Sequence, residues 1–242
     1  MDDDLEQLLR GLKLKRLLEI MAGELAWAEE QRPSYSELLR RLFRQEYEAQ
    51  QDRYLEYRVD RAKLPERWSL KTFPWARQPG VDRRLMEQLA ELDFIARGAN
   101  LVFVGPTGVG KTGLASALLL EALYRGRRGL FVKAQELFDE MYTTLADHSS
   151  RKLLDRLVRL EVLLIDEMGY LNLRPEQSNI FFKLMEERYT AGRSTIITTN
   201  LDYDEWYGFL GHKEMVAALL DRLRHRCTTI HIEGASLRTP QR

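Results

Sequence analysis

The chain has 242 residues, a length that suits one large domain or two smaller ones. Its 37 Lys and Arg residues balance its 37 Asp and Glu residues, so net charge predicts no partner. Cys227 is the only cysteine, which excludes an intrachain disulfide and a thiolate zinc site and favours a reducing cytoplasm. The apolar runs are far shorter than the roughly 18 residues of a membrane span, so no membrane partner is expected.

The first third of the chain has the pattern of amphipathic helices. Leucines recur at spacings of three and four from Leu5 onward, which predicts one helix through Met21. Ser34 and Glu37 form a capping box, which predicts a second helix ending near Lys63. The predicted organisation is a small helical domain over 1–66, a linker and helix over 67–94, and a larger domain over 95–242.

The larger domain alternates short apolar runs with helical segments. The runs that we predict to be buried strands are Leu101–Val104, Leu130–Val132, Val162–Ile165, Ser194–Thr199 and Thr228–Ile232. Strands that alternate with helices in this way form a parallel sheet covered by helices on both faces. The predicted fold class is therefore α/β.

A phosphate-binding loop follows the first of these strands. The motif G-x-x-x-x-G-K-[ST] is satisfied by Gly105, Pro106, Thr107, Gly108, Val109, Gly110, Lys111 and Thr112, and Gly113 follows it. Backbone N–H groups of such a loop surround phosphate oxygens, the lysine reaches the β- and γ-phosphates, and the threonine ligates Mg²⁺. The strand before it and the helix after it, over 114–123, favour a nucleotide site over a chance glycine-rich turn.

Two carboxylates end the third predicted strand, at Asp166 and Glu167. Asp166 is the candidate that holds Mg²⁺, and Glu167 is the candidate that polarises the attacking water. The alternative, a strand followed by a helix cap, loses weight because the phosphate loop precedes the pair.

Asn200 follows the next strand. The carboxyl ends of parallel strands meet at one edge of the sheet, beside the nucleotide, so Asn200 is a candidate for orienting water or sensing the γ-phosphate. A turn-forming asparagine is the competing interpretation.

Taken in order, these motifs resemble an AAA+ ATPase, and within that superfamily the IstB-like helper ATPases of insertion-sequence transposons and the related DnaC-type helicase loaders. The resemblance covers nearly the whole chain. Its segments are GPTGVGKT, LLIDEMGYL, FFKLMEERY, ITTNLDYDEW, LLDRLRHR and EGASLR. The chain departs at Gly113, where relatives commonly carry histidine, and at Leu237, where they carry tyrosine.

The resemblance implies roles for two arginines. Arg222 would act as an arginine finger on the γ-phosphate held by a neighbouring subunit, and Arg238 would contact phosphate within its own subunit. A guanidinium stabilises charge spread over phosphoryl oxygens, so a finger at an interface makes hydrolysis depend on assembly. An ion pair or a solvated helix end remains the alternative for Arg222.

The same resemblance implies a DNA-binding region between the second and third strands, with candidates Lys133, Arg151, Lys152 and Arg156. An exposed helix with balanced charge is the alternative, because acidic residues are interspersed among them. Arg40, Arg41 and Arg44 form a second basic cluster that could face DNA or a partner subunit, with a solvated helix face as the default. Contacts to phosphates would give binding without sequence preference.

The sequence as a whole predicts an ATP- and Mg²⁺-dependent ATPase that oligomerises on duplex DNA and recruits or activates a transposase. A helicase loader is the first alternative. A nucleotide-binding scaffold that hardly hydrolyses ATP is the second.

Overall fold

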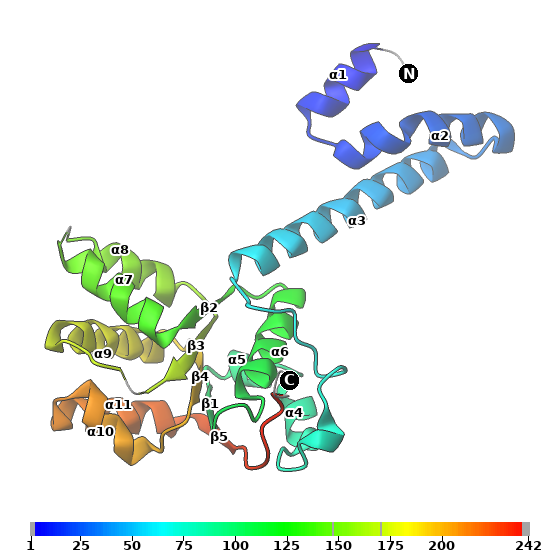
Figure 1. Ribbon diagram of the computed structural model, residues 1–242. Helices are drawn as coiled ribbons and strands as arrows, with labels where there is room; N and C mark the ends of the chain where they lie inside the picture. The colour runs from blue at the N-terminus through cyan, green and yellow to red at the C-terminus, as the bar shows by residue number, and fades with distance from the viewer. Residues whose placement is uncertain (1–2, 147, 170, 239–242) are drawn as a thin grey trace. The chain divides into compact units, whose positions relative to one another are not determined.

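The computed structural model describes residues 3–146, 148–169 and 171–238 (Figure 1). It divides into two compact units, Met1–Tyr57 and Arg58–Arg242. The division falls inside one long helix, whereas the sequence suggested a domain boundary at residue 66; the domain bounds remain a prediction.

The first unit consists of α1 (Asp3–Gly11), α2 (Lys15–Gln31) and most of α3 (Tyr35–Arg61). Its core joins Leu9, Leu17, Met21 and Leu42. The side-chain oxygen of Ser34 accepts a hydrogen bond from the Glu37 N–H at 3.2 Å, which confirms the predicted start of α3.

One helix prediction in this unit is wrong. The leucine-rich stretch from Leu5 to Met21 is two helices, because the chain turns between Gly11 and Lys15 and Lys13 has a φ of 59°. A left-handed residue ends a helix even where the spacing of leucines continues.

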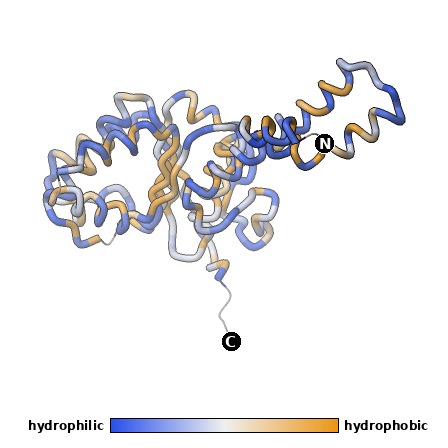
Figure 2. Tube along the Cα trace, turned by 90° about the horizontal axis from the view of Figure 1, so that it is seen from above, coloured by the Kyte–Doolittle hydropathy of each residue, from blue (hydrophilic) through white to orange (hydrophobic). Residues whose placement is uncertain are grey.

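The second unit is built on five parallel strands in the order β2-β3-β4-β1-β5. Their bounds are β1 (Asn100–Val104), β2 (Gly129–Lys133), β3 (Val162–Met168), β4 (Ser194–Thr199) and β5 (Cys227–His231). The tube coloured by hydropathy is most hydrophobic along this sheet (Figure 2). Every residue of β1 and β4 is buried, but β2 and β5 form the edges and are only partly buried. The expectation that all five strands are buried on both faces is therefore wrong for the edge strands.

Helices cover both faces of the sheet (Figure 1). One face carries α6 (Lys111–Tyr124), near α4 (Arg83–Leu89) and α5 (Asp93–Ala96). The other carries α7 (Ala134–Ala146), α8 (Ser150–Val158), α9 (Pro175–Thr190), α10 (Trp206–Leu210) and α11 (Lys213–His225). Short 3-10 helices lie at Trp75–Arg77 and Tyr203–Glu205. Among the described residues, none of the helices combines the length and the apolar character that crossing a bilayer requires.

Candidate nucleotide site

The phosphate loop connects β1 to the amino end of α6, at the carboxyl edge of the sheet. Gly108 and Gly110 have φ values of 87° and 100°, a backbone region that favours glycine. A Cβ added at Gly108 would stand 2.2 Å from the Ser236 Oγ. The Leu237 N–H also donates to the Gly108 carbonyl at 2.8 Å, so the closing segment of the chain lies directly on the loop.

Lys111 points into the loop. Its Nζ donates to the carbonyls of Gly105 and Pro106 and to the Asn200 Oδ1, each at 2.7 Å. Burial lowers the pKa of this ammonium, and the nearby charges of Asp166 and Glu167 oppose that shift. Lys111 is thus held among oxygen acceptors that phosphate oxygens can replace.

The residues expected to hold Mg²⁺ lie together. The Thr112 hydroxyl donates to the Asp166 carboxylate at 2.8 Å, and the Thr198 hydroxyl donates to the same oxygen. Hydroxyl and carboxylate oxygens suit Mg²⁺, which binds proteins through few ligands and completes its shell with water and phosphate. Burial raises the pKa of Asp166, while the hydrogen bonds from Thr198 and Thr112 act in the opposite direction.

Glu167 has an unusual backbone. Its φ is 60°, and the register of β3 against β4 shifts between Ile165 and Met168. Its N–H donates to the Thr198 hydroxyl at 3.0 Å, which holds the turn in place. The Glu167 side chain is 61% exposed and faces the Lys133 Nζ at 3.5 Å. A left-handed backbone at a glutamate costs conformational energy, and this strained residue lies beside the phosphate loop.

Asn200 bridges the two sides of the loop. Its Oδ1 accepts a hydrogen bond from the Lys111 Nζ, and its Nδ2 donates one to the Thr107 hydroxyl at 3.2 Å. Arg238 lines the same pocket, and its charge lowers the pKa of Lys111. The structure therefore brings together Lys111, Thr112, Asp166, Glu167, Asn200 and Arg238.

The pocket around these residues has a volume of about 600 Å³ and includes Trp68, a side chain that sequence reasoning missed. Its apolar walls come from Trp68, Phe73 and Leu237. A Cβ at Gly113 would stand 3.2 Å from the Trp68 ring, so the indole lies over this glycine inside a regular α6. No motif identifies Trp68, because it lies 37 residues before Gly105, the first residue of the loop.

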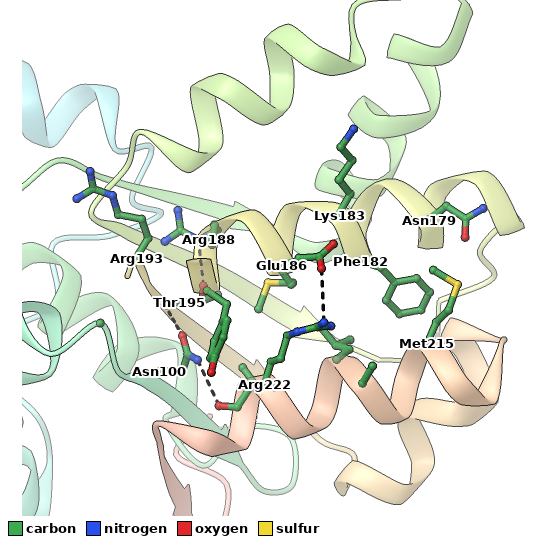
Figure 3. A pocket seen from close by; sticks show the side chains of 16 residues that line it. Asn100, Asn179, Phe182, Lys183, Glu186, Arg188, Arg193, Thr195, Met215 and Arg222 are labelled. Atoms are coloured by element: carbon green, nitrogen blue, oxygen red, sulfur yellow. Dashed lines mark hydrogen bonds and ion pairs between the residues drawn. The ribbon is translucent and has the colours of Figure 1, made fainter. Parts of the chain in front are cut away.

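Arg222 lies near Asn100 and Thr195 (Figure 3), at the amino ends of the strands. It lines a second pocket, of about 310 Å³, with Asn100, the first residue of β1, and Thr195, the second residue of β4. Its Nη2 is 3.4 Å from the Glu186 carboxylate. Because β1 has five residues, the amino and carboxyl ends of the strands are separated by roughly 16 Å. Arg222 thus lies at the amino ends of the strands, whereas the phosphate loop of the same chain lies at their carboxyl ends.

The DNA-binding candidates have varied surroundings. Lys133 lies in the nucleotide pocket beside Glu167. Arg151 pairs with Asp155 and Glu187, and Arg156 pairs with Glu140. Lys152 is exposed. In the first unit, Arg41 pairs with Glu24, whereas Arg40 and Arg44 are exposed. Their contacts with DNA stay predictions.

A parallel sheet with a phosphate loop after β1 and an acidic pair at the end of β3 defines a P-loop nucleotide-binding protein of the AAA+ class. Residues 7–242 match the family described as IstB-like ATP binding protein, and the chain belongs to that family.

Two curated relatives are similar over nearly their full length. An ATP-binding protein of insertion sequence IS21 from Pseudomonas aeruginosa is 35% identical over 239 residues, which is 99% of this chain and 90% of the relative. An ATP-binding protein of insertion sequence IS5376 from Geobacillus stearothermophilus is 34% identical, over 98% of this chain and 94% of the relative.

Solved structures share the fold. The crystal structure of DnaI is 27% identical with a TM-score of 0.57, covering 71% of this chain and 91% of DnaI. The DnaC helicase loader is 25% identical with a TM-score of 0.54, covering 62% of this chain and 88% of the loader. The replication initiator DnaA, bound to AMPPCP and single-stranded DNA, is 18% identical with a TM-score of 0.60, covering 72% of this chain and 52% of DnaA, which supports the fold alone.

Proposed function

We propose that this chain is a transposition helper: a Mg²⁺-dependent ATPase that assembles on duplex DNA and recruits or activates a transposase. The observation that carries the proposal is the position of Arg222, on the sheet edge opposite its own phosphate loop. An arginine there reaches a γ-phosphate only in a neighbouring copy, so hydrolysis would require assembly.

Within one copy, the residues have separable roles. Lys111 and Arg238 would bind phosphate oxygens, and Thr112 with Asp166 would hold Mg²⁺, which supplies charge neutralisation when bound. Glu167 and Asn200 would position the attacking water. The γ-phosphate would then hold an interface between copies that hydrolysis releases.

For DNA, we propose backbone contacts from the α7–α8 segment. Lys152 is exposed, and Arg151 and Arg156 form surface ion pairs, which contribute little stability and which phosphates can replace. Such contacts would be insensitive to sequence and sensitive to salt.

A helicase loader is the second candidate, and the likeness to DnaI and to the DnaC loader favours it. Those structures cover 71% and 62% of this chain, whereas the insertion-sequence relatives cover 98–99% of it, including the helical first unit. The N-terminal helices therefore support the transposition helper.

The test is ATP turnover and particle mass in the same samples, with duplex DNA, with single-stranded DNA and without DNA. We expect duplex DNA to stimulate turnover without a helicase. The Glu167→Gln variant should bind ATP, hydrolyse little and accumulate as large assemblies on the duplex. A native protein that stays monomeric with ATP and ignores duplex DNA would contradict the proposal.

A further inference from the structure

Helix α3 segregates its charges within the first unit. Over residues 35–57, a sector of about 140° around the helix contains no carboxylate. The acidic residues of this stretch all lie outside that sector: Glu37, Glu46, Glu48, Asp52 and Glu56. The sector contains Ser36, Gln50, Gln51 and Tyr57 and six further residues, Leu39, Arg40, Phe43, Arg44, Tyr47 and Tyr54, which we name the basic aromatic face.

The basic aromatic face is open. Leu39, Phe43, Tyr47 and Tyr54 are 52–64% exposed, although each is a large side chain. Arg40 and Arg44 are exposed too, and within the described part of the chain neither forms an ion pair or a side-chain hydrogen bond. Single exposed apolar residues are common, but a row of them along one helix marks an interaction surface.

The other side of α3 holds the unit together. Leu42 joins the core, and Arg41 pairs with Glu24 and lies over the Trp27 ring at 4.3 Å. Buried Glu46 accepts from the Leu17 N–H and pairs with Arg53 at 2.7 Å. Arg41 and Arg53 therefore have contacts that stabilise the first unit. The basic aromatic face has no such structural role among the described residues.

We propose that the basic aromatic face binds the phosphate backbone of duplex DNA; this inference rests on the proposed function and adds a contact surface to it. Guanidinium groups match phosphate oxygens in geometry and charge. The face contains no carboxylate that would repel the phosphates. Arg40 and Arg44 lie one helical turn apart, and the hydroxyls of Tyr47 and Tyr54 add donors of a kind that contacts phosphates. From Leu39 to Tyr54 the face extends about 22 Å, enough to follow several phosphates.

A second copy of α3 fits this face less well. Leu39, Phe43 and Tyr47 follow one another in steps of four, which drift about 40° around the helix each time. A coiled-coil seam requires alternating steps of three and four. Charge also favours DNA, since the face carries only cations.

The experiment measures duplex binding by the full chain, with ATP, as a function of salt. Arg40→Glu with Arg44→Glu should weaken binding at least tenfold at about 0.1 M salt and reduce the slope of log K against log salt by about two. The matched control is Lys13→Glu with Lys15→Glu, which makes the same charge change at two exposed residues, one in the turn after α1 and one at the start of α2, and should weaken binding less than about threefold. Phe43→Ser with Tyr47→Ser should weaken binding without changing the salt slope.

Each outcome is decisive. If the native chain binds the duplex and the arginine variant binds equally well, or if the lysine control loses as much, the inference is overturned and the proposed function stands. If the native chain does not bind duplex DNA at all, the proposed function fails and the inference with it. A variant that keeps DNA binding but changes particle mass in ATP, or loses binding to anionic lipid vesicles, would assign the face to a second copy or a lipid surface and overturn the inference.

Discussion

Asp166 is a buried carboxyl whose pKa is raised, mainly by burial. A raised native pKa favours the protonated form, so its contribution to stability is present below about pH 4 and is lost as pH rises through the raised value. At neutral pH the ionised group therefore opposes folding. We predict that Asp166→Asn raises the thermal midpoint of the nucleotide-free chain, increasingly from about pH 4 to pH 7, and weakens Mg²⁺ binding by about 10- to 100-fold.

Thermal scans across that pH range and a Mg²⁺ titration of ATP turnover check this prediction. An asparagine can still accept from Thr112 and Thr198, because both hydroxyls donate to one carboxylate oxygen. A lower midpoint at neutral pH would contradict the account, since it would mean that the charged form stabilises the empty site.

Among the site residues, those in contiguous motifs were predictable from the sequence. Contacts between residues far apart in the sequence were not. The phosphate loop and the Asp166–Glu167 pair follow from local sequence, because each motif carries its own strand or helix. Trp68 over Gly113 and Lys133 beside Glu167 depend on where distant segments meet. No spacing in the sequence encodes those contacts.

Arg188 joins three elements of the second unit. It is 1% exposed and donates to the carbonyls of Leu157, Leu160 and Ser194 and to the Thr195 hydroxyl. Burial lowers the pKa of Arg188 to about 9, which leaves it charged at neutral pH. Arg188→Met would leave those buried oxygens unpaired, so we predict a loss of about 3 kcal/mol or more and a thermal midpoint lowered by roughly 6–12 °C.

Thermal unfolding checks this prediction, and Lys183→Met is the matched control because it removes an exposed cation from the same helix, α9. Equal midpoints for the two variants would show that Arg188 is not a structural connector.

Strand order and the exposure of the edge strands were only partly predictable from the sequence. Apolar runs predicted five strands and a parallel sheet, which the structure confirms. The runs did not distinguish the central strands from the edges β2 and β5, because strand order depends on how the crossovers pack. Leucine spacing likewise missed the turn at Lys13 between α1 and α2.

In the proposed assembly, one copy supplies the phosphate loop and its neighbour supplies Arg222. Two inactive variants should then complement each other. A Glu167→Gln copy still offers Arg222, and an Arg222→Ala copy still offers Glu167, so a mixed assembly contains intact sites although neither variant alone does.

The measurement is ATP turnover on duplex DNA for Arg222→Ala, for Glu167→Gln and for their mixture, with nucleotide binding and particle mass recorded for each. We predict that both variants bind ATP and hydrolyse little alone, and that mixing them restores a clear fraction of native turnover. Turnover near the native rate in Arg222→Ala alone, or no recovery in mixtures that assemble together, would contradict a site shared between copies.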